Sequence, residues 1–125
     1  MKRIICGTDF SAHAAEAANV AAALAVRNNA TLTLLHAVAP WEVEMLEKVT
    51  IDAIRGKRRR MLVAEGNRLR ATGAQVLENL VLGTPHDMLV ARAPHVDADL
   101  IVVSSHGDIS TARWIAGSVA LRTAQ

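Results

Sequence analysis

The fold is decided by residues 3–38, RIICGTDFSAHAAEAANVAAALAVRNNATLTLLHAV, which read as a strand, a helix and a second strand. Residues 3–7 are a short apolar run that ends at a glycine, and residues 31–38 are β-branched and apolar, as in a buried strand. Between them, Ser11 is a candidate helix N-cap. The following helix carries a stripe of small apolar residues suited to close packing on a sheet, made of Ala14, Ala17, Ala18, Ala21, Leu24 and Ala25.

The next segment, residues 43–70, has a less regular helical pattern. Its apolar stripe is interrupted by RGKRRR at residues 55–60, and Gly56 is expected to break or kink the helix. Gly73 supplies a stop signal after it. We therefore predict one helix over residues 43–70.

The rest of the chain repeats the alternation of strand and helix. Residues 74–83 are predicted to form a third strand. Residues 84–96 follow as a helix with Thr84 as N-cap and Pro85 at the first helical position, and the helix is expected to end near its second proline. Residues 100–103 are apolar throughout and predict a fourth strand, buried on both faces.

Strands that alternate with helices imply right-handed crossovers and a parallel sheet with helices on both faces. We predict an α/β fold, an open doubly wound parallel sheet, in a single domain covering residues 1–125. Ligands of such sheets bind beyond the carboxyl ends of the strands. Three of these strand ends carry polar or small residues that could contact a ligand, at residues 7–9, 36–38 and 104–107.

Composition argues against several classes of protein. No apolar run approaches the roughly 18–20 residues of a membrane span, and the N-terminal apolar run is shorter than the roughly 7–15 residues of a signal peptide. We therefore expect a cytoplasmic protein without a membrane partner. The single cysteine, Cys6, lies in a predicted buried strand, where an inert thiol is expected.

Nucleic-acid binding is also not expected. The formal charge is only +2, tyrosine is absent, and there is one phenylalanine, so few side chains could stack on bases. The basic run at residues 55–60 could contact phosphates, but acidic residues flank it, and a solvated helix face is the favoured interpretation.

Several strand-end residues allow two interpretations. Asp9 could cap the first helix or could project into the crevice and accept hydrogen bonds from a ribose or a base. Gly107 and Gly117–Ser118 could form a backbone cradle for phosphates at a helix start, or only a turn and an ordinary N-cap. His36 and His106 lack a third ligand at metal-like spacing, so satisfied polar side chains are favoured over a metal site. No catalytic triad or Gly-Lys-Ser/Thr phosphate loop is evident.

Four stretches together resemble the universal stress protein family: IICGTDFSAHAAEAANVAAALA, LTLLHAV, VLGTPHDMLVARAPHVDADLIVVSSHG and GSVALR. The resemblance covers nearly the whole chain. Its most specific element is the pattern Gly-x-x-Gly, nine residues, Gly-Ser/Thr, which the nucleotide-binding branch of the family uses to hold the phosphates and ribose of ATP. Here the second glycine is Gly107 and Gly117–Ser118 completes the pattern, whereas Ser104 stands at the first glycine.

The resemblance implies a stress-response protein that binds ATP, with or without Mg²⁺, as a regulatory or protective module that hydrolyses ATP slowly if at all. Asp9 would meet the base or ribose, and the main chain of Ala37 would contact adenine. The implied site consists of Gly7, Thr8, Asp9, Ala37, Ser104, His106, Gly107, Gly117, Ser118 and Val119.

Two departures from the family pattern bear on this expectation. Ser104 adds a Cβ and a hydroxyl where the binders bring backbone close to the ligand, so it could clash or could donate a replacement hydrogen bond. It motivates an alternative, a family member that binds no nucleotide and acts through protein contacts. Family members also continue into a fifth strand that commonly forms the dimer contact, whereas this sequence ends at Gln125. The sequence is therefore expected to lack the usual fifth strand, and either the chain is truncated or a homodimer or another partner chain covers the edge of residues 100–103.

Overall fold

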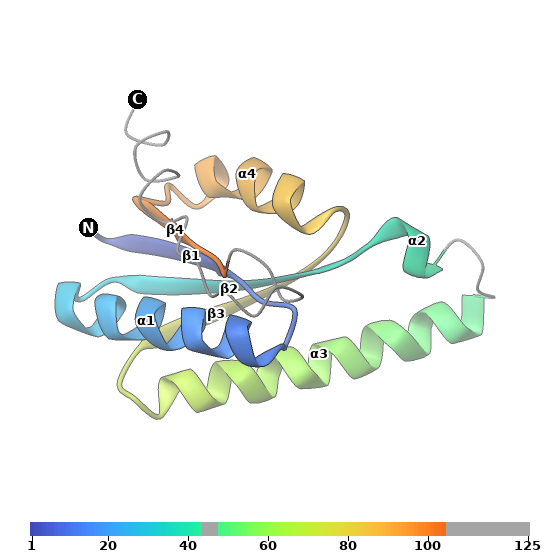
Figure 1. Cartoon of the computed structure of the whole chain (residues 1–125), viewed down its shortest axis with the longest axis horizontal. Coiled ribbons are helices and arrows are strands. Elements are labelled where there is room, and N and C mark those ends of the chain that lie inside the picture. The colour runs from blue at the N-terminus through green and yellow to red at the C-terminus, as the bar shows by residue number, and fades with distance from the viewer. Residues whose placement is uncertain (44–47, 105–125) are drawn as a thin grey trace.

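The computed structural model describes residues 1–43 and 48–104 (Figure 1). The strands and helices alternate along the chain as the sequence predicts. The four strands are β1 (Arg3–Gly7), β2 (Thr31–Val38), β3 (Gln75–Leu82) and β4 (Leu100–Val102). The helices of the described ranges are α1 (Ala12–Asn28), α2 (Pro40–Val43), α3 (Lys48–Arg70) and α4 (Pro85–His95).

The strands form one parallel sheet in the order β3-β2-β1-β4. β2 pairs with β3 along its whole length, from Thr31 opposite Gln75 to Val38 opposite Leu82. β1 pairs with β2 on one side and with β4 on the other, so the chain winds outward from β1 to β3 and then returns to the other side of β1. The predicted α/β fold with a doubly wound parallel sheet is confirmed.

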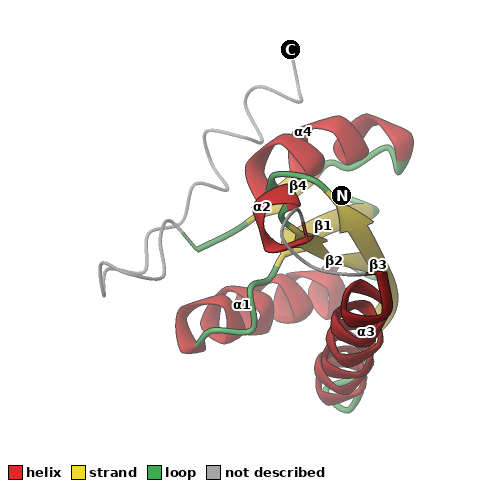
Figure 2. Cartoon of the chain, turned by 90° about the vertical axis from the view of Figure 1, so that its right-hand side faces the viewer, coloured by secondary structure: helices red, strands yellow, loops and turns green. Residues whose placement is uncertain are grey.

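Helices cover both faces of the sheet. α1 and α3 lie on one face and α4 lies on the other (Figure 2). The small-residue stripe of α1 is buried as predicted, and Leu62 and Leu69 of α3 join it to fill the core on that side of the sheet. The opposite side has a smaller core, in which Leu89 of α4 packs with Ile5 and Ile101. Short alanine side chains allow α1 to approach the sheet closely.

The ends of α1 follow from identifiable residues. Ser11 has extended backbone, and its hydroxyl oxygen accepts a hydrogen bond from the Ala14 amide at 3.1 Å, so the predicted N-cap is confirmed. Asn29 ends the helix in the left-handed conformation. Thr84 occupies the N-cap position of α4 with Pro85 after it, but its side chain makes no capping hydrogen bond.

The predicted helix over residues 43–70 differs from the structure. A short helix, α2, already begins at Pro40, where Pro40 occupies the first helical position and the Glu42 carboxylate accepts a hydrogen bond from the Ala39 amide at 2.9 Å. The longer helix, α3, runs through Gly56 without a break, so the expected kink is wrong. Burying Leu62 and Leu69 of α3 in the core stabilises the helix by more than the roughly 1 kcal/mol that a glycine within a helix costs.

Asp99 links the start of β4 to the start of β1. Its carboxylate accepts hydrogen bonds from the amides of Lys2 at 2.6 Å and Arg3 at 2.9 Å. These bonds lower the pKa of Asp99. The amide of Asp99 in turn donates to the carbonyl of Arg3 at 2.8 Å, which sets the start of β4 beside β1.

Candidate functional site

A cleft of about 220 Å³ opens at the carboxyl ends of β1, β2 and β4. It lies where the winding of the sheet reverses, between the first turns of α1 and α4. The cleft is lined by Gly7, Thr8, Asp9, Ala14, Leu35, His36, Ala37, Pro85, His86, Leu89, Val103 and Ser104. It therefore has the position that the fold predicts for a ligand site.

The loop that follows β1 is held by a succession of local hydrogen bonds. The Thr8 amide donates to the Leu35 carbonyl at 2.9 Å, and the Thr8 hydroxyl accepts from the Phe10 amide at 3.0 Å. Phe10 has a φ of 66°, which a phenylalanine rarely adopts. The Asp9 carboxylate accepts from the Ser11 amide at 2.8 Å. The loop is thus fixed in a strained conformation at the mouth of the cleft.

Asp9 is not the N-cap of α1, and its side chain lies at the cleft. Ser11, not Asp9, is the N-cap of α1, but one oxygen of Asp9 closes the turn that leads into the cap. The Asp9 side chain is exposed and also lines the cleft. Within the described residues the second carboxylate oxygen has no hydrogen-bond donor, which leaves it available to a ligand.

His36 lies beneath this loop and is 4% exposed. Its Nδ1 is 2.8 Å from the carbonyl oxygen of Thr8, and its Nε2 is 2.9 Å from a guanidinium nitrogen of Arg58. A carbonyl only accepts and a guanidinium only donates, so the neutral ring carries its proton on Nδ1. Burial lowers the pKa of His36, and the Arg58 charge lowers it further, against the opposing effect of the bond to Thr8. The ring also packs on Phe10, with centroids 4.4 Å apart.

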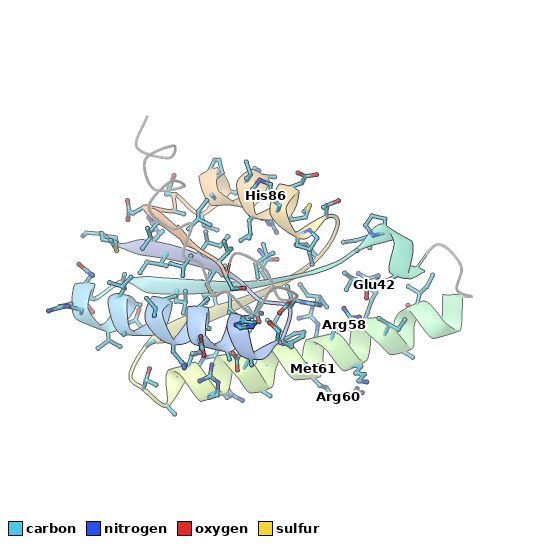
Figure 3. The ribbon with its side chains drawn as sticks, viewed as in Figure 1. Glu42, Arg58, Arg60, Met61 and His86 are labelled. Atoms are coloured by element: carbon cyan, nitrogen blue, oxygen red, sulfur yellow. The ribbon has the colours of Figure 1, made fainter. Side chains whose placement is uncertain are left out.

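Arg58 continues this chain of contacts to α2. Its second guanidinium nitrogen donates to the Glu42 carboxylate at 2.5 Å, and Figure 3 shows the two side chains facing each other between α3 and α2. The bond to Arg58 lowers the pKa of Glu42. The sequence-based view of residues 55–60 as a solvated face holds for the exposed Arg60, which points away from the body of the protein, but it is wrong for Arg58.

The remaining cleft wall is apolar, with backbone groups at its base. β1 pairs with β2 only as far as Gly7 opposite Leu35, and Ala37 lies two residues further along β2. Backbone groups of alternate strand residues point to the same side, so those of Ala37 face the space beyond the end of β1. Leu35, Leu89 and Val103 supply apolar side chains around them. Such a wall suits a flat heterocycle that also hydrogen-bonds to backbone.

The structure brings five of the ten predicted site residues to the cleft, namely Gly7, Thr8, Asp9, Ala37 and Ser104. The other five, His106, Gly107, Gly117, Ser118 and Val119, lie outside the described residues. Sequence reasoning had placed His36 at a strand end as a satisfied polar residue, which is confirmed, but had missed His86. The signal for His86 was its position in the first turn of the helix that follows β3. Among the described residues no group of three metal-ligating side chains comes together.

Comparison with known proteins decides the family. The model of the universal stress protein family matches residues 1–125. The chain belongs to the universal stress protein family. No curated protein matches it significantly. Universal stress proteins are also found among the solved structures with the same fold.

Three of these structures illustrate the likeness. A universal stress protein in complex with cAMP is 31% identical, with a TM-score of 0.71 over 94% of this chain and 83% of that one. A universal stress protein family member from Burkholderia pseudomallei is 24% identical, with a TM-score of 0.73 over 99% and 90%. The universal stress protein of Archaeoglobus fulgidus in complex with dAMP is 23% identical, with a TM-score of 0.67 over 82% and 80%.

Two further properties of this universal stress protein concern its cysteine and its helices. Burial raises the pKa of the Cys6 thiol to about 12, so the inert thiol expected from the sequence fits its surroundings. Within residues 1–43 and 48–104, no helix combines the length and the apolar character that a membrane span requires.

Proposed function

We propose that this universal stress protein binds ATP in the cleft at the carboxyl ends of β1, β2 and β4. In this proposal it acts in the cytoplasm as a regulatory or protective module, and it hydrolyses ATP slowly if at all. The observation that carries the proposal is the meeting of Asp9, Ala37 and Ser104 at one cleft, three residues far apart in the sequence. A family relative at 31% identity was solved with the adenine nucleotide cAMP, which supports the nucleotide class.

The roles follow from the chemistry of the lining. The free oxygen of Asp9 would accept hydrogen bonds from the ribose hydroxyls, and the backbone of Ala37 would pair with the edge of the adenine ring. Leu35, Leu89 and Val103 would pack on the ring. The phosphates, with any Mg²⁺ bound to them, are assigned to Gly107, Gly117 and Ser118 on the sequence pattern alone.

Isothermal titration of the full chain with ATP tests this proposal, and two substitutions at Asp9 sharpen it. Asp9→Asn keeps an oxygen for the Ser11 amide but turns an NH₂ donor toward the ligand, whereas Asp9→Ala loses both functions. We expect ATP affinity to fall at least about tenfold in both variants. The reason is that a hydrogen bond from a ribose hydroxyl to a charged carboxylate contributes roughly 1.5–3 kcal/mol. Only Asp9→Ala should also lower the melting temperature.

Absence of saturable heat at millimolar ATP would overturn the proposal. Parallel titrations with ADP, AMP and cAMP rank the nucleotides, and ATP is expected to bind most tightly. Nucleotide extracted from freshly purified protein and identified by mass spectrometry gives an independent result.

Ser104 favours a second candidate function, a universal stress protein that acts through protein contacts without a nucleotide. The Ser104 side chain borders the cleft at the position where the family pattern has glycine. The substitution Ser104→Gly separates the two candidates. Unchanged ATP affinity in this variant supports a tolerated serine, and reduced affinity supports a serine that donates a hydrogen bond to the ligand. Binding that appears only in the variant supports the second candidate. The homodimer expected from the sequence is tested by light scattering of the purified chain, with and without ATP.

A further inference from the structure

A continuous bridge of polar contacts connects the cleft through Arg58 of α3 to α2, which follows the end of β2. It begins at the Thr8 carbonyl, passes through both ring nitrogens of His36, then through the two ends of the Arg58 guanidinium, and reaches the Glu42 carboxylate. The second oxygen of Glu42 accepts from the Ala39 amide at 2.9 Å, in the residue just after β2. We call these five residues the cleft-to-helix bridge.

We propose that Arg58 and Glu42 are positioning residues for the cleft, so that ligand binding there and docking of α2 against α3 stabilise each other. This inference rests on the proposed function for the identity of the ligand. Neither residue lines the cleft, and each acts through His36 on the loop that carries Asp9.

The loop after β1 needs contacts from other parts of the chain to keep its conformation. Phe10 adopts a left-handed backbone that is unfavourable for a non-glycine residue, and such conformations persist only where neighbouring contacts enforce them. His36 supplies two of those contacts, the hydrogen bond to the Thr8 carbonyl and the ring packing on Phe10. Displacing His36 therefore releases the loop and with it the Asp9 carboxylate.

The bridge also fixes His36 in one tautomer and one orientation. Arg58 can donate to Nε2 only while that nitrogen is unprotonated, which leaves the ring proton on Nδ1, where Thr8 requires it. Asp9 and Glu42 are the acidic groups whose charges act on the ring, and Arg58 is the basic one. Loss of Arg58 removes the partner that selects this tautomer and orientation.

α2 depends on the same contacts. Glu42 both caps the first turn of α2 and binds Arg58, so the same carboxylate holds the start of α2 and its contact with α3. The side chains of Arg58 and Glu42 are 24% and 27% exposed, so their pairing is only partly screened by water. A ligand that orders the loop around Asp9 should thus order α2 through the bridge, and the effect is reciprocal.

The test compares Arg58→Gln with Arg60→Gln, a matched control on the same helix whose side chain is exposed and points away from α2 and the sheet (Figure 3). ATP affinity is measured by titration, and hydrogen exchange of the Ala39 amide is measured with and without saturating ATP. We expect Arg58→Gln to weaken ATP binding about fivefold or more and to abolish the ATP-dependent protection at Ala39. Arg60→Gln should behave as wild type in both measurements.

Glu42→Gln keeps the size of the side chain and guards against a folding defect in the first variant. It should also reduce ATP-dependent protection at Ala39, while the melting temperature confirms that the chain is folded. Wild-type affinity and protection in both Arg58→Gln and Glu42→Gln would overturn the inference and leave the proposed function intact.

A failure of the proposed function gives a different result. If wild-type protein binds no ATP, nitrogen NMR of the His36 ring and amide shifts of Thr8 and Asp9 still test the bridge. A changed ring tautomer and shifted loop amides in Arg58→Gln, but not in Arg60→Gln, support positioning by Arg58. An unchanged His36 ring and unchanged loop amides in Arg58→Gln overturn it.

Discussion

The Nδ1 atom of His36 lies 2.8 Å from the carbonyl oxygen of Thr8, and this contact joins the end of β2 to the loop after β1. The ring stays neutral there because burial lowers the pKa of His36 and Nε2 faces Arg58. The unfolded chain, by contrast, has the ordinary histidine pKa of about 6.5.

This difference predicts a pH dependence of stability. Because the folded-state pKa is lowered, the contribution of His36 is fully present above about pH 6.5 and is lost as the pH falls from there toward the folded-state pKa. We expect the free energy of unfolding to fall between pH 7 and pH 5, by at most about 1.4 kcal/mol per pH unit from this one group. Urea titrations at several pH values measure it, and His36→Asn should flatten the slope. A wild-type stability that rises on acidification would contradict this account.

Two glycines should respond to alanine with opposite signs. A Cβ at Gly7 would come within 2.7 Å of a Leu89 methyl group, so Gly7→Ala must displace Leu89 and should cost about 1–3 kcal/mol. A Cβ at Gly56 would meet only the far end of Arg60 at 3.6 Å, so Gly56→Ala should stabilise α3 by up to about 1 kcal/mol. Thermal melts of both variants test this prediction. An equal loss of stability in Gly7→Ala and Gly56→Ala would show that contact with Leu89 does not set the response at Gly7.

Leucines on opposite sides of the fold should differ sharply. Leu62 is fully buried between α3 and the sheet, whereas Leu77 on β3 is 60% exposed. Leu62→Ala should lower the free energy of unfolding by about 2–5 kcal/mol, and Leu77→Ala should change it by less than about 0.5 kcal/mol. Denaturant unfolding measures both, and a large loss in Leu77→Ala would reveal a packing role for the exposed face of β3.

The Cys6 thiol should resist modification in the folded protein. With a pKa raised to about 12 and no exposure, it has almost no thiolate at neutral pH. A thiol-reactive dye is expected to label it only at the rate at which the chain unfolds, and labelling should become fast in denaturant. Rapid labelling under native conditions would mean that β1 opens locally.

The parts of the fold that depend on local pattern could be predicted from the sequence. The alanine stripe of α1, the Ser11 cap and the apolar strands each follow from residue spacing. The alternation of strand and helix indicated a parallel, doubly wound sheet, although it did not give the strand order. The ends of those strands then indicated where Asp9 and Ala37 would meet. α2 was missed because its capping carboxylate, Glu42, looks like any other acidic residue near a proline.

The bridge from Thr8 to Glu42 could not have been predicted from the sequence. Arg58 lies among five other residues of a basic run, and nothing in that run distinguishes the one arginine that faces inward. Its partner His36 is 22 positions away, and their contact depends on the angle at which α3 crosses the end of β2. Long-range geometry of this kind follows from packing of whole helices, which residue spacing does not encode.

The Asp99 contacts with Lys2 and Arg3 have a consequence for the order in which the chain is completed during synthesis. β1 is made first but lies at the centre of the sheet, and its neighbour β4 emerges almost 100 residues later. Until then, the side of β1 that pairs with β4 offers unpaired backbone groups to other strands. We therefore expect the nascent chain to be prone to non-native strand pairing until β4 has emerged and Asp99 has bonded to Lys2 and Arg3.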